Sequence, residues 1–152
     1  MIKIEKALFR DSGEIIDIEL KSTEFPLSME LVKMFFTVDE RHAFIARIGK
    51  KAVGSALVSY DKSSKLCYIH SLAVHPDFRF KGVSRKLLEG IAKYATTFGL
   101  EKYTLKIPHY QVEDAEDPYN IKEWLDKTGF KFVELRHNDM FRYGKDYDTY
   151  IY

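Results

Sequence analysis

Residues 71–95, SLAVHPDFRFKGVSRKLLEGIAKYA, leave this chain little freedom in its local folding. An apolar run comes first and predicts a strand, and a short loop with Arg79, Lys81 and Gly82 follows it. Beyond Gly82, apolar residues recur at helical spacing on one face, at Val83, Leu87, Leu88, Ile91, Ala92 and Ala95. The segment therefore predicts a strand that passes through a basic, glycine-containing loop directly into a helix.

Strands are predicted on both sides of this segment. A first strand is expected over residues 2–8, and residues 42–74 indicate three strands with turns at 49–51 and 61–64. Such short turns join antiparallel neighbours, so these three strands should form a meander. Further strands are expected over residues 102–107, 130–137 and 146–152.

Helices are predicted from capping residues and apolar spacing. Asp11, followed by Glu14, indicates the start of a helix through Ile15, Ile16 and Leu20. The other predicted helix ends are a cap at Ser28, a C-terminal glycine at Gly99, and a last helix that begins at Asp117 and Pro118 and stops at Gly129. The expected order is strand, two helices, three strands, helix, strand, helix, two strands, which is an α/β (α+β) class of fold.

Composition narrows the kinds of protein to consider. The 152 residues, 45% of them hydrophobic, have the makeup of one soluble domain over residues 1–152. A net charge of +1 gives no overall field toward nucleic acid or an anionic membrane, so neither partner is expected. Cys67 is the single cysteine and cannot form an internal disulfide. With no apolar run long enough for a signal peptide or a membrane span, we expect a cytoplasmic protein.

The loop at Gly82 has the features of an anion-binding site. A strand that leads into a helix gathers unpaired backbone N–H groups and the positive end of a helix dipole around one point. Gly82 allows a phosphate to approach the backbone, while Arg79 and Lys81 add positive charge. Two phosphates joined to an extended ligand would fit this arrangement.

These residues resemble a known cofactor signature. Residues 70–88, HSLAVHPDFRFKGVSRKLL, are similar to the acetyl-CoA-binding segment of the GNAT superfamily of N-acetyltransferases, Arg/Gln-x-x-Gly-x-Gly/Ala. Arg79, Gly82 and Ser84 occupy the three key places, with serine where the family has Gly or Ala. The later WLDKTGF resembles the family's YEKLGF segment. The resemblance implies a mixed, mostly antiparallel seven-stranded sheet with about four helices, in the order β-α-α-β-β-β-α-β-α-β-β.

The resemblance also implies how acetyl-CoA, the cosubstrate, would bind without a metal. In the family the strand before the loop splays from its neighbour, and its main chain pairs with the pantetheine arm. By this likeness the main chain of Leu72, Ala73 and Val74 would hold the arm. Backbone N–H groups of the loop would bind the pyrophosphate, at Phe80, Lys81, Gly82, Val83, Ser84 and Arg85.

Tyr68 and His70 are the candidates for the base that removes a proton from an attacking amine. They lie two apart on one strand and should project to the same face. Histidine has a reference pKa near 6.5, whereas tyrosine, near 10, would act through water. A strand histidine bonded to a neighbour and an aromatic core residue are the alternative interpretations. His75 should order the turn before the loop, and His42 should be a solvated strand end.

The general acid is the point at which this chain departs from the family. Relatives commonly use a tyrosine four residues before the glycine of the Gly-Phe pair, and this chain has Leu125 there. Tyr119 or Tyr110 could substitute, or the thiolate could leave unassisted, since a thiol pKa near 8.5 makes it a fair leaving group.

The main hypothesis is an acetyltransferase that moves an acetyl group from acetyl-CoA to a primary amine by direct attack in a ternary complex. Cys67 should face away from Tyr68 and His70, which argues against a covalent thiol intermediate. The acceptor could be a protein N-terminus or lysine, or a small amine. An acidic loop over 113–117 could attract a cationic amine. Tyr143, Tyr147 and Tyr150 resemble the tyrosine-rich last hairpin of the family's protein N-terminal acetyltransferases, which favours a protein N-terminus slightly.

Two rival classes remain. A CoA-binding regulatory or interaction module with little or no turnover is favoured by Leu125. A nucleic-acid-binding protein would use the loop's basic residues, but the near-zero net charge and the lack of interleaved aromatics speak against it. The acceptor amine, the pathway and the oligomeric state, including a homodimer, stay open.

Overall fold

The computed structural model describes residues 1–22, 27–100, 102–108, 134–142 and 145–151, with side chains described up to residue 105. The chain falls into two compact units, Met1–Tyr103 and Thr104–Tyr152. No described helix is both long and apolar enough to cross a membrane. The mixed α/β class predicted from the sequence is confirmed.

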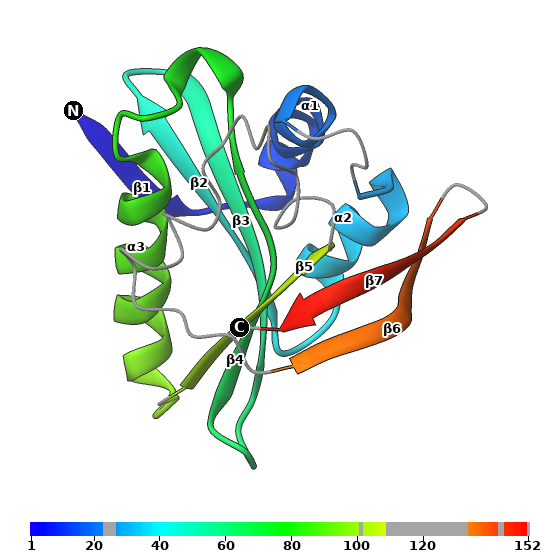
Figure 1. The fold of residues 1–152 in the computed structure, drawn as a ribbon. Coiled ribbons are helices and arrows are strands. Elements are labelled where there is room, and N and C mark those ends of the chain that lie inside the picture. Colours follow the sequence, from blue (N-terminus) through cyan, green and yellow to red (C-terminus); the bar gives the residue numbers. More distant parts are fainter. Residues whose placement is uncertain (23–26, 101, 109–133, 143–144, 152) are drawn as a thin grey trace. The chain divides into compact units, whose positions relative to one another are not determined.

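Four antiparallel strands form the sheet of the first unit (Figure 1). They are β1 (Ile2–Lys6), β2 (Arg41–Ile48), β3 (Lys51–Asp61) and β4 (Leu66–Val74), and each pairs with the next. The β2–β3 turn contains Gly49 at a φ of 61°, a left-handed conformation that glycine adopts without strain. The meander predicted within residues 42–74 is therefore confirmed.

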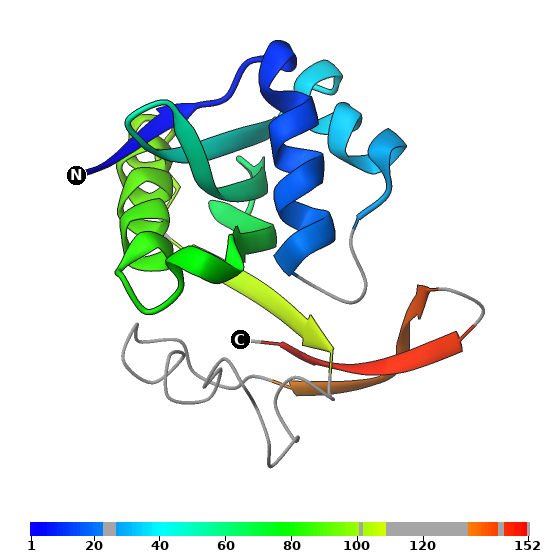
Figure 2. The same ribbon diagram turned by 90° about the horizontal axis from the view of Figure 1, so that it is seen from above.

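Helices cover both faces of these strands. α1 (Ser12–Ser22) and α2 (Met29–Thr37) lie on one face and α3 (Val83–Thr97) on the other, as Figures 1 and 2 show. On the α1/α2 side the core includes Ile15, Val32, Phe35, Ile45 and Leu57. α2 buries Val32 and Phe35 on the side that faces the sheet, whereas β3, which is covered on both faces, buries residues 53–58 without interruption.

α3 approaches the sheet at two glycines. A Cβ at Gly54 of β3 would lie 2.7 Å from Cγ1 of Val83, and a Cβ at Gly90 of α3 would lie 2.7 Å from Cγ2 of Ile4. Both separations are below ordinary van der Waals contact, so these positions need glycine for packing. This approach fixes the N-terminus of α3 against β3.

The predicted ends of the helices are partly confirmed. Ser28 caps α2, since its hydroxyl accepts the N–H of Leu31 at 3.2 Å. Gly99, at a φ of 71°, follows α3 as predicted. Asp11 as the first cap is wrong, because a 3-10 turn, Phe9–Asp11, precedes α1 and the Asp11 carboxylate accepts the N–H of Leu8 at 2.8 Å.

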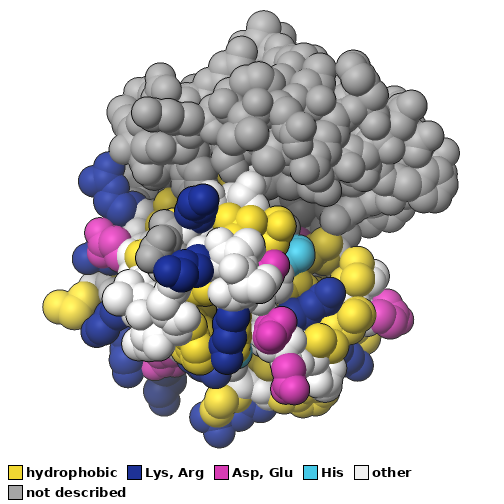
Figure 3. All heavy atoms as spheres, turned by 90° about the horizontal axis from the view of Figure 1, so that it is seen from below, with side chains coloured by type: hydrophobic (Ala, Val, Ile, Leu, Met, Phe, Trp, Pro, Cys, Tyr) yellow, Lys and Arg dark blue, Asp and Glu magenta, His cyan; other side chains and the backbone are white. Residues whose placement is uncertain are grey.

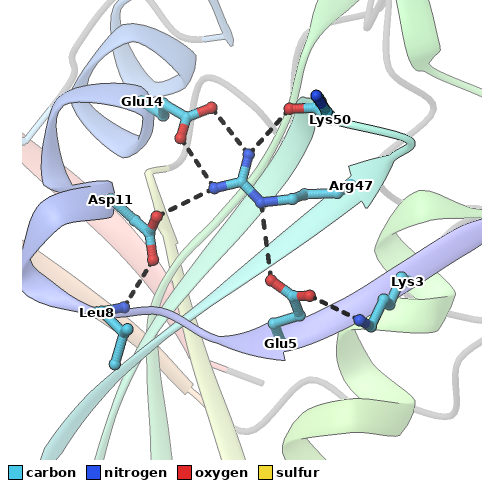
Figure 4. Close-up of polar contacts among 7 residues, drawn as sticks. All are labelled: Lys3, Glu5, Leu8, Asp11, Glu14, Arg47 and Lys50. Atoms are coloured by element: carbon cyan, nitrogen blue, oxygen red, sulfur yellow. Dashed lines mark hydrogen bonds and ion pairs between the residues drawn. The ribbon is translucent and has the colours of Figure 1, made fainter.

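An ion-pair network joins α1 to β2 (Figure 4). The Arg47 guanidinium binds Glu14 through two hydrogen bonds, of 3.0 and 2.8 Å, and Asp11 at 3.1 Å. The hydrogen bond with Glu14 is the main reason why the pKa of Arg47 is raised above its ordinary value. Glu5 on β1 completes the network, 3.7 Å from Nε of Arg47. Glu14, whose spacing from Asp11 predicted the start of a helix, thus binds a residue of β2.

An aromatic cluster lies where β2 and β3 meet α3. His42 stacks on Tyr60, with ring centroids 5.1 Å apart, and its Nδ1 lies 3.2 Å from the Tyr94 hydroxyl. Burial, and then the charge of Lys6, lower the pKa of His42 to about 4. The prediction of a solvated strand end at His42 is wrong, because Tyr60, Tyr94 and Phe98 surround the ring.

The second unit contains a three-stranded antiparallel arrangement. β5 (Lys102–Pro108) enters it, and β6 (Glu134–Arg142) and β7 (Lys145–Ile151) pair with each other, with β7 also pairing with β5. β6 continues past the predicted end at residue 137, with an irregularity in its pairing between Arg136 and Met140. The helix predicted from Asp117 to Gly129, the fourth of the fold, lies outside the described residues.

Candidate active site

A β-bulge in β4 places His70. β3 and β4 shift register between Leu57 and Val58, so that Leu57 faces Ser71 while Val58 faces Ile69. His70 is the additional residue between these two pairs. A bulge bends its strand and redirects the side chain of the inserted residue. His70 consequently projects from the sheet at the point where regular pairing is interrupted.

Side chains from β3 and α2 contact the exposed His70 ring. Its Nε2 lies 2.6 Å from the hydroxyl oxygen of Ser59, and its ring meets Phe35 of α2 edge to face at 5.2 Å. Tyr68 lies on the same side of β4, with its ring centroid 6.3 Å from that of His70. Because Tyr68 is 43% exposed, it is not an aromatic core residue. The predicted pair therefore shares one face of β4, and His70 is bonded to a neighbour.

Cys67 lies on the opposite side of the same strand. It is 2% exposed, and burial raises the pKa of its thiol to about 11. A buried, protonated thiol is a poor nucleophile at neutral pH. The geometry thus agrees with the argument against a thiol intermediate.

The loop after β4 leads into α3 as the sequence predicted. Gly82 precedes the first residue of α3 and has a φ of 83°, and a Cβ built there would meet no atom within 4 Å. The outer side of this glycine is open, so an anion can approach the first N–H groups of the helix. His75 orders the preceding turn, since its Nδ1 accepts the N–H of Asp77 at 3.1 Å. The open side of Gly82 therefore leaves space beside the N-terminus of α3.

The other predicted cofactor residues occupy different environments. Ala73 and Val83 are buried, Leu72, Val74, Arg79 and Ser84 are half-buried, and Phe80, Lys81 and Arg85 are exposed. The main chain of the three β4 residues pairs with β3, opposite Ala56, Ser55 and Gly54. Arg79 differs from expectation, because its Nη2 donates to the carbonyl of Ser22 at 2.8 Å. Its guanidinium therefore binds the C-terminal end of α1.

Sequence reasoning missed a buried carboxylate beside the bulge. Glu19 of α1 is 2% exposed, accepts a hydrogen bond from the hydroxyl of Ser71, and accepts the N–H of Leu27 at 3.3 Å. The sequence signal for Glu19 was its position on the apolar face of α1, directly after buried Ile18. Leu20, the apolar residue that follows, is 63% exposed and lies off this face. Ser59 was also missed, since only the strand register brings it to His70.

Several predicted site residues cannot be placed. Tyr110, Tyr119 and Leu125, which bear on the general acid, lie outside the described residues, as does the acidic loop over 113–117. Within the described part of the chain, no three His, Cys, Asp or Glu side chains gather as a metal site would require. A hollow of about 410 Å³ lies between α1 and the start of β3, and none of the predicted site residues lines it.

Comparisons with known proteins agree with this geometry. The family model for the acetyltransferase (GNAT) family matches residues 12–130. The structure is similar to ribosomal-protein-S18-alanine N-acetyltransferase from Escherichia coli, with a TM-score of 0.81, 19% identity, and coverage of 99% of this chain and 91% of that chain. No curated protein sequence gave a significant match.

Two further solved structures share the fold. NAA60 from Arabidopsis thaliana, in complex with a bisubstrate analogue, has a TM-score of 0.75, 15% identity, and coverage of 99% of this chain and 95% of that chain. The spermidine/spermine N-acetyltransferase SpeG from Vibrio cholerae has a TM-score of 0.71, 16% identity, and coverage of 99% and 89%. At these identities the likeness concerns the fold.

Proposed function

Since the chain belongs to the acetyltransferase (GNAT) family, we propose that it moves the acetyl group of acetyl-CoA to a primary amine by direct attack within a ternary complex. Family membership makes the chain an acyltransferase that uses acetyl-CoA. Beyond this activity, the proposal specifies the acceptor amine, the mechanism of the transfer and the residues that bind the cofactor or take part in catalysis. A single domain over residues 1–152 is part of the proposal and is supported by relatives that match 99% of the chain.

One structural observation carries the proposal. The bulge that exposes His70 lies on β4, the strand that leads to the glycine-containing loop at Gly82. His70 comes four residues before Val74, the last residue of this strand. A cofactor with its pyrophosphate at this loop and its arm along the main chain of residues 72–74 would extend toward His70. The loop fits this ligand because the outer side of Gly82 is open. Bound acetyl-CoA supplies an activated acetyl thioester.

His70 and Tyr68 are the proposed proton acceptors. An amine attacks only in its neutral form, so an ammonium must lose its proton before or during attack. If Nε2 of His70 carries the proton and donates to Ser59, then Nδ1 holds the lone pair; in the other tautomer Nε2 accepts from the Ser59 hydroxyl. Ser59 and Phe35 hold the ring in place in both cases. Tyr68, on the same face, would act through water.

The proposed reaction balances without an enzyme-bound acyl group. A bond forms between the amine nitrogen and the acetyl carbon, and the carbon–sulfur bond breaks. The proton lost by the amine goes to the base, and the CoA thiolate takes a proton from water or from a tyrosine. Much of the rate acceleration can come from holding the two reactants together. Cys67 is not needed and is buried on the other side of β4.

The acceptor is proposed to be a protein N-terminus or lysine, or a small amine. The similar structures include proteins named for the alanine of ribosomal protein S18 and for spermidine and spermine, which are a protein acceptor and small amines. We favour a protein N-terminus slightly, on the strength of the tyrosines near the chain end. A cytoplasmic location is proposed as well, and a homodimer is one open arrangement.

The proposal has two rivals. The regulatory module rested on Leu125, which lies outside the described residues. The second rival is a nucleic-acid-binding protein. On the face of the molecule that Figure 3 shows, the Lys and Arg side chains are interspersed with hydrophobic and acidic ones. Such mixing does not favour a phosphate backbone as the ligand.

A titration with three ligands distinguishes the proposed acetyltransferase from its two rivals. The purified protein should be titrated with acetyl-CoA, CoA and a mixed-sequence oligonucleotide, and then assayed against peptides, polyamines and arylalkylamines. Binding of acetyl-CoA with turnover of at least one amine supports the proposal. Tight acetyl-CoA binding with no amine acetylated would favour the regulatory module. Binding of the oligonucleotide alone would favour a nucleic-acid-binding protein.

A further inference from the structure

The loop between β4 and α3 carries an exposed phenyl ring whose conformation is costly. Phe80 is 77% exposed, more than any other large hydrophobic side chain of the described residues except Met1 at the chain end. Its φ is 61°, in the left-handed region that bulky side chains rarely adopt. Residues held in such conformations are found at ligand sites more often than elsewhere. Both the strain and the exposure lack a structural benefit within the described residues.

The neighbouring side chains bind protein groups, in contrast to Phe80. Arg79 donates to the carbonyl of Ser22 at 2.8 Å, and the Lys81 ammonium lies 5.3 Å from the ring centroid of Phe78. Phe78 in turn meets His75 edge to face at 5.6 Å. The loop is thus held on both sides of Phe80, while the phenyl ring itself points into solvent.

We propose that Phe80 is the surface on which the adenine ring of CoA stacks, an inference that rests on the proposed function. Phe80 precedes Gly82 by two residues, so their Cα atoms are at most about 7 Å apart. In CoA a single ribose separates the diphosphate from the adenine. A diphosphate bound at the open side of Gly82 therefore brings the adenine within reach of the phenyl ring. Stacking of a base on an aromatic side chain changes affinity by about 5- to 150-fold.

The surroundings of Phe80 favour a nucleotide over a protein partner. A protein-docking surface usually presents a contiguous apolar patch. Phe80 instead stands next to the exposed Lys81 and two residues before Gly82, whose open backbone suits phosphate. One flat apolar ring next to cations and open backbone N–H groups matches the parts of a nucleoside diphosphate.

Binding measurements with two ligands test the proposal. Acetyl-CoA and S-acetyl-4′-phosphopantetheine share the thioester, the arm and one phosphate, and only acetyl-CoA has the adenosine. Phe80→Asn removes the ring and relieves the backbone, because asparagine tolerates a positive φ. We expect it to weaken acetyl-CoA binding at least fivefold, about 1 kcal/mol, to leave phosphopantetheine binding unchanged, and to raise Tm. Phe80→Tyr keeps the ring and should bind acetyl-CoA within about twofold of wild type.

The outcomes are distinct. Equal weakening of both ligands by Phe80→Asn would overturn the proposal, because it would mean that Phe80 shapes the loop backbone. Unchanged affinity for acetyl-CoA would also overturn it. If the wild-type protein fails to bind acetyl-CoA at all, the proposed function fails and this inference with it. Saturation transfer from phenyl protons to adenine H2 and H8, present in wild type and lost in Phe80→Asn, gives an independent measure.

Discussion

Nε2 of His70 lies 2.6 Å from the hydroxyl oxygen of Ser59, beside a register shift that inserts His70 as an additional residue into β4. The bulge and the hydroxyl act together on one ring. The bulge turns the imidazole out of the sheet, and the hydrogen bond with Ser59 fixes the rotation of the ring. A ring held in this way is suited to accept a proton from a substrate bound beside β4.

His70→Ala should lower kcat about a hundredfold or more at neutral pH, with acetyl-CoA affinity nearly intact, because it removes the proposed base. Steady-state kinetics and calorimetry check the two halves. Ser59→Ala keeps the ring and removes one hydrogen bond, which is worth about 1 kcal/mol, or roughly fivefold in rate. The loss of kcat should therefore be much larger in His70→Ala than in Ser59→Ala.

Tyr68→Phe is the matched comparison, since it keeps the exposed ring and removes only the hydroxyl. A large loss of kcat in Tyr68→Phe with a mild one in His70→Ala would transfer the role of base to Tyr68. If neither variant lowers kcat by more than about threefold, general base catalysis from β4 is wrong.

Gly82→Asp should abolish acetyl-CoA binding, because it places a side chain and a negative charge where the pyrophosphate is proposed to lie. Gly49→Asp is the matched control. Gly49 also has a positive φ, 61° against 83°, and a Cβ at either glycine would meet no atom within 4 Å. The two variants should lose similar stability, and only Gly82→Asp should lose the cofactor. An unchanged dissociation constant in folded Gly82→Asp would refute the cofactor site.

Local patterns predicted the parts of the fold that depend on neighbours in sequence. The meander, the Ser28 cap and the glycine after α3 follow from turn and cap chemistry within a few residues. The placement of Tyr68 and His70 on one side of β4 follows from alternation.

Partners far apart in sequence could not be predicted in the same way. The bulge at His70 is a property of how two strands pair, so neither strand alone encodes it visibly. Arg79 was expected to face a phosphate, and its hydrogen bond to Ser22 joins residues 57 apart. The sequence around His42 predicts a solvated side chain, because Tyr94 and Phe98, which contact its ring, belong to a helix that starts about forty residues later.

Glu19→Ala should destabilise the fold by about 3 kcal/mol, because it leaves the Ser71 hydroxyl and the Leu27 N–H without their buried acceptor. Urea unfolding of the free protein measures this change. Asp17→Asn, on the exposed side of the same helix, removes only a surface ion pair with Lys21 and should cost less than about 0.5 kcal/mol. Equal effects of the two variants would show that the buried carboxylate has no special role. A cycle with Ser71→Ala isolates the pairwise coupling.

The environment of His42 predicts how stability depends on pH. The pKa of His42 is about 4 in the folded protein against 6.5 for an ordinary histidine, mainly because Tyr60, Tyr94 and Phe98 bury the ring. The unfolded chain therefore binds a proton more readily than the folded one. The stabilising contribution is complete above about pH 6.5 and is lost as the pH falls toward 4.

Substituting His42 isolates this contribution from the titration of carboxylates. His42→Phe keeps an aromatic ring against Tyr60 and removes the proton-binding group, so its free energy of unfolding should fall less than that of wild type between pH 6.5 and 4. We expect a difference of about 1–2 kcal/mol, below the full value of the pKa shift because water still reaches part of the ring. Urea unfolding at half-unit steps of pH gives both curves. Parallel curves over this range would mean that His42 titrates alike in the folded and unfolded chain, and the buried aromatic environment would then have no effect on its proton.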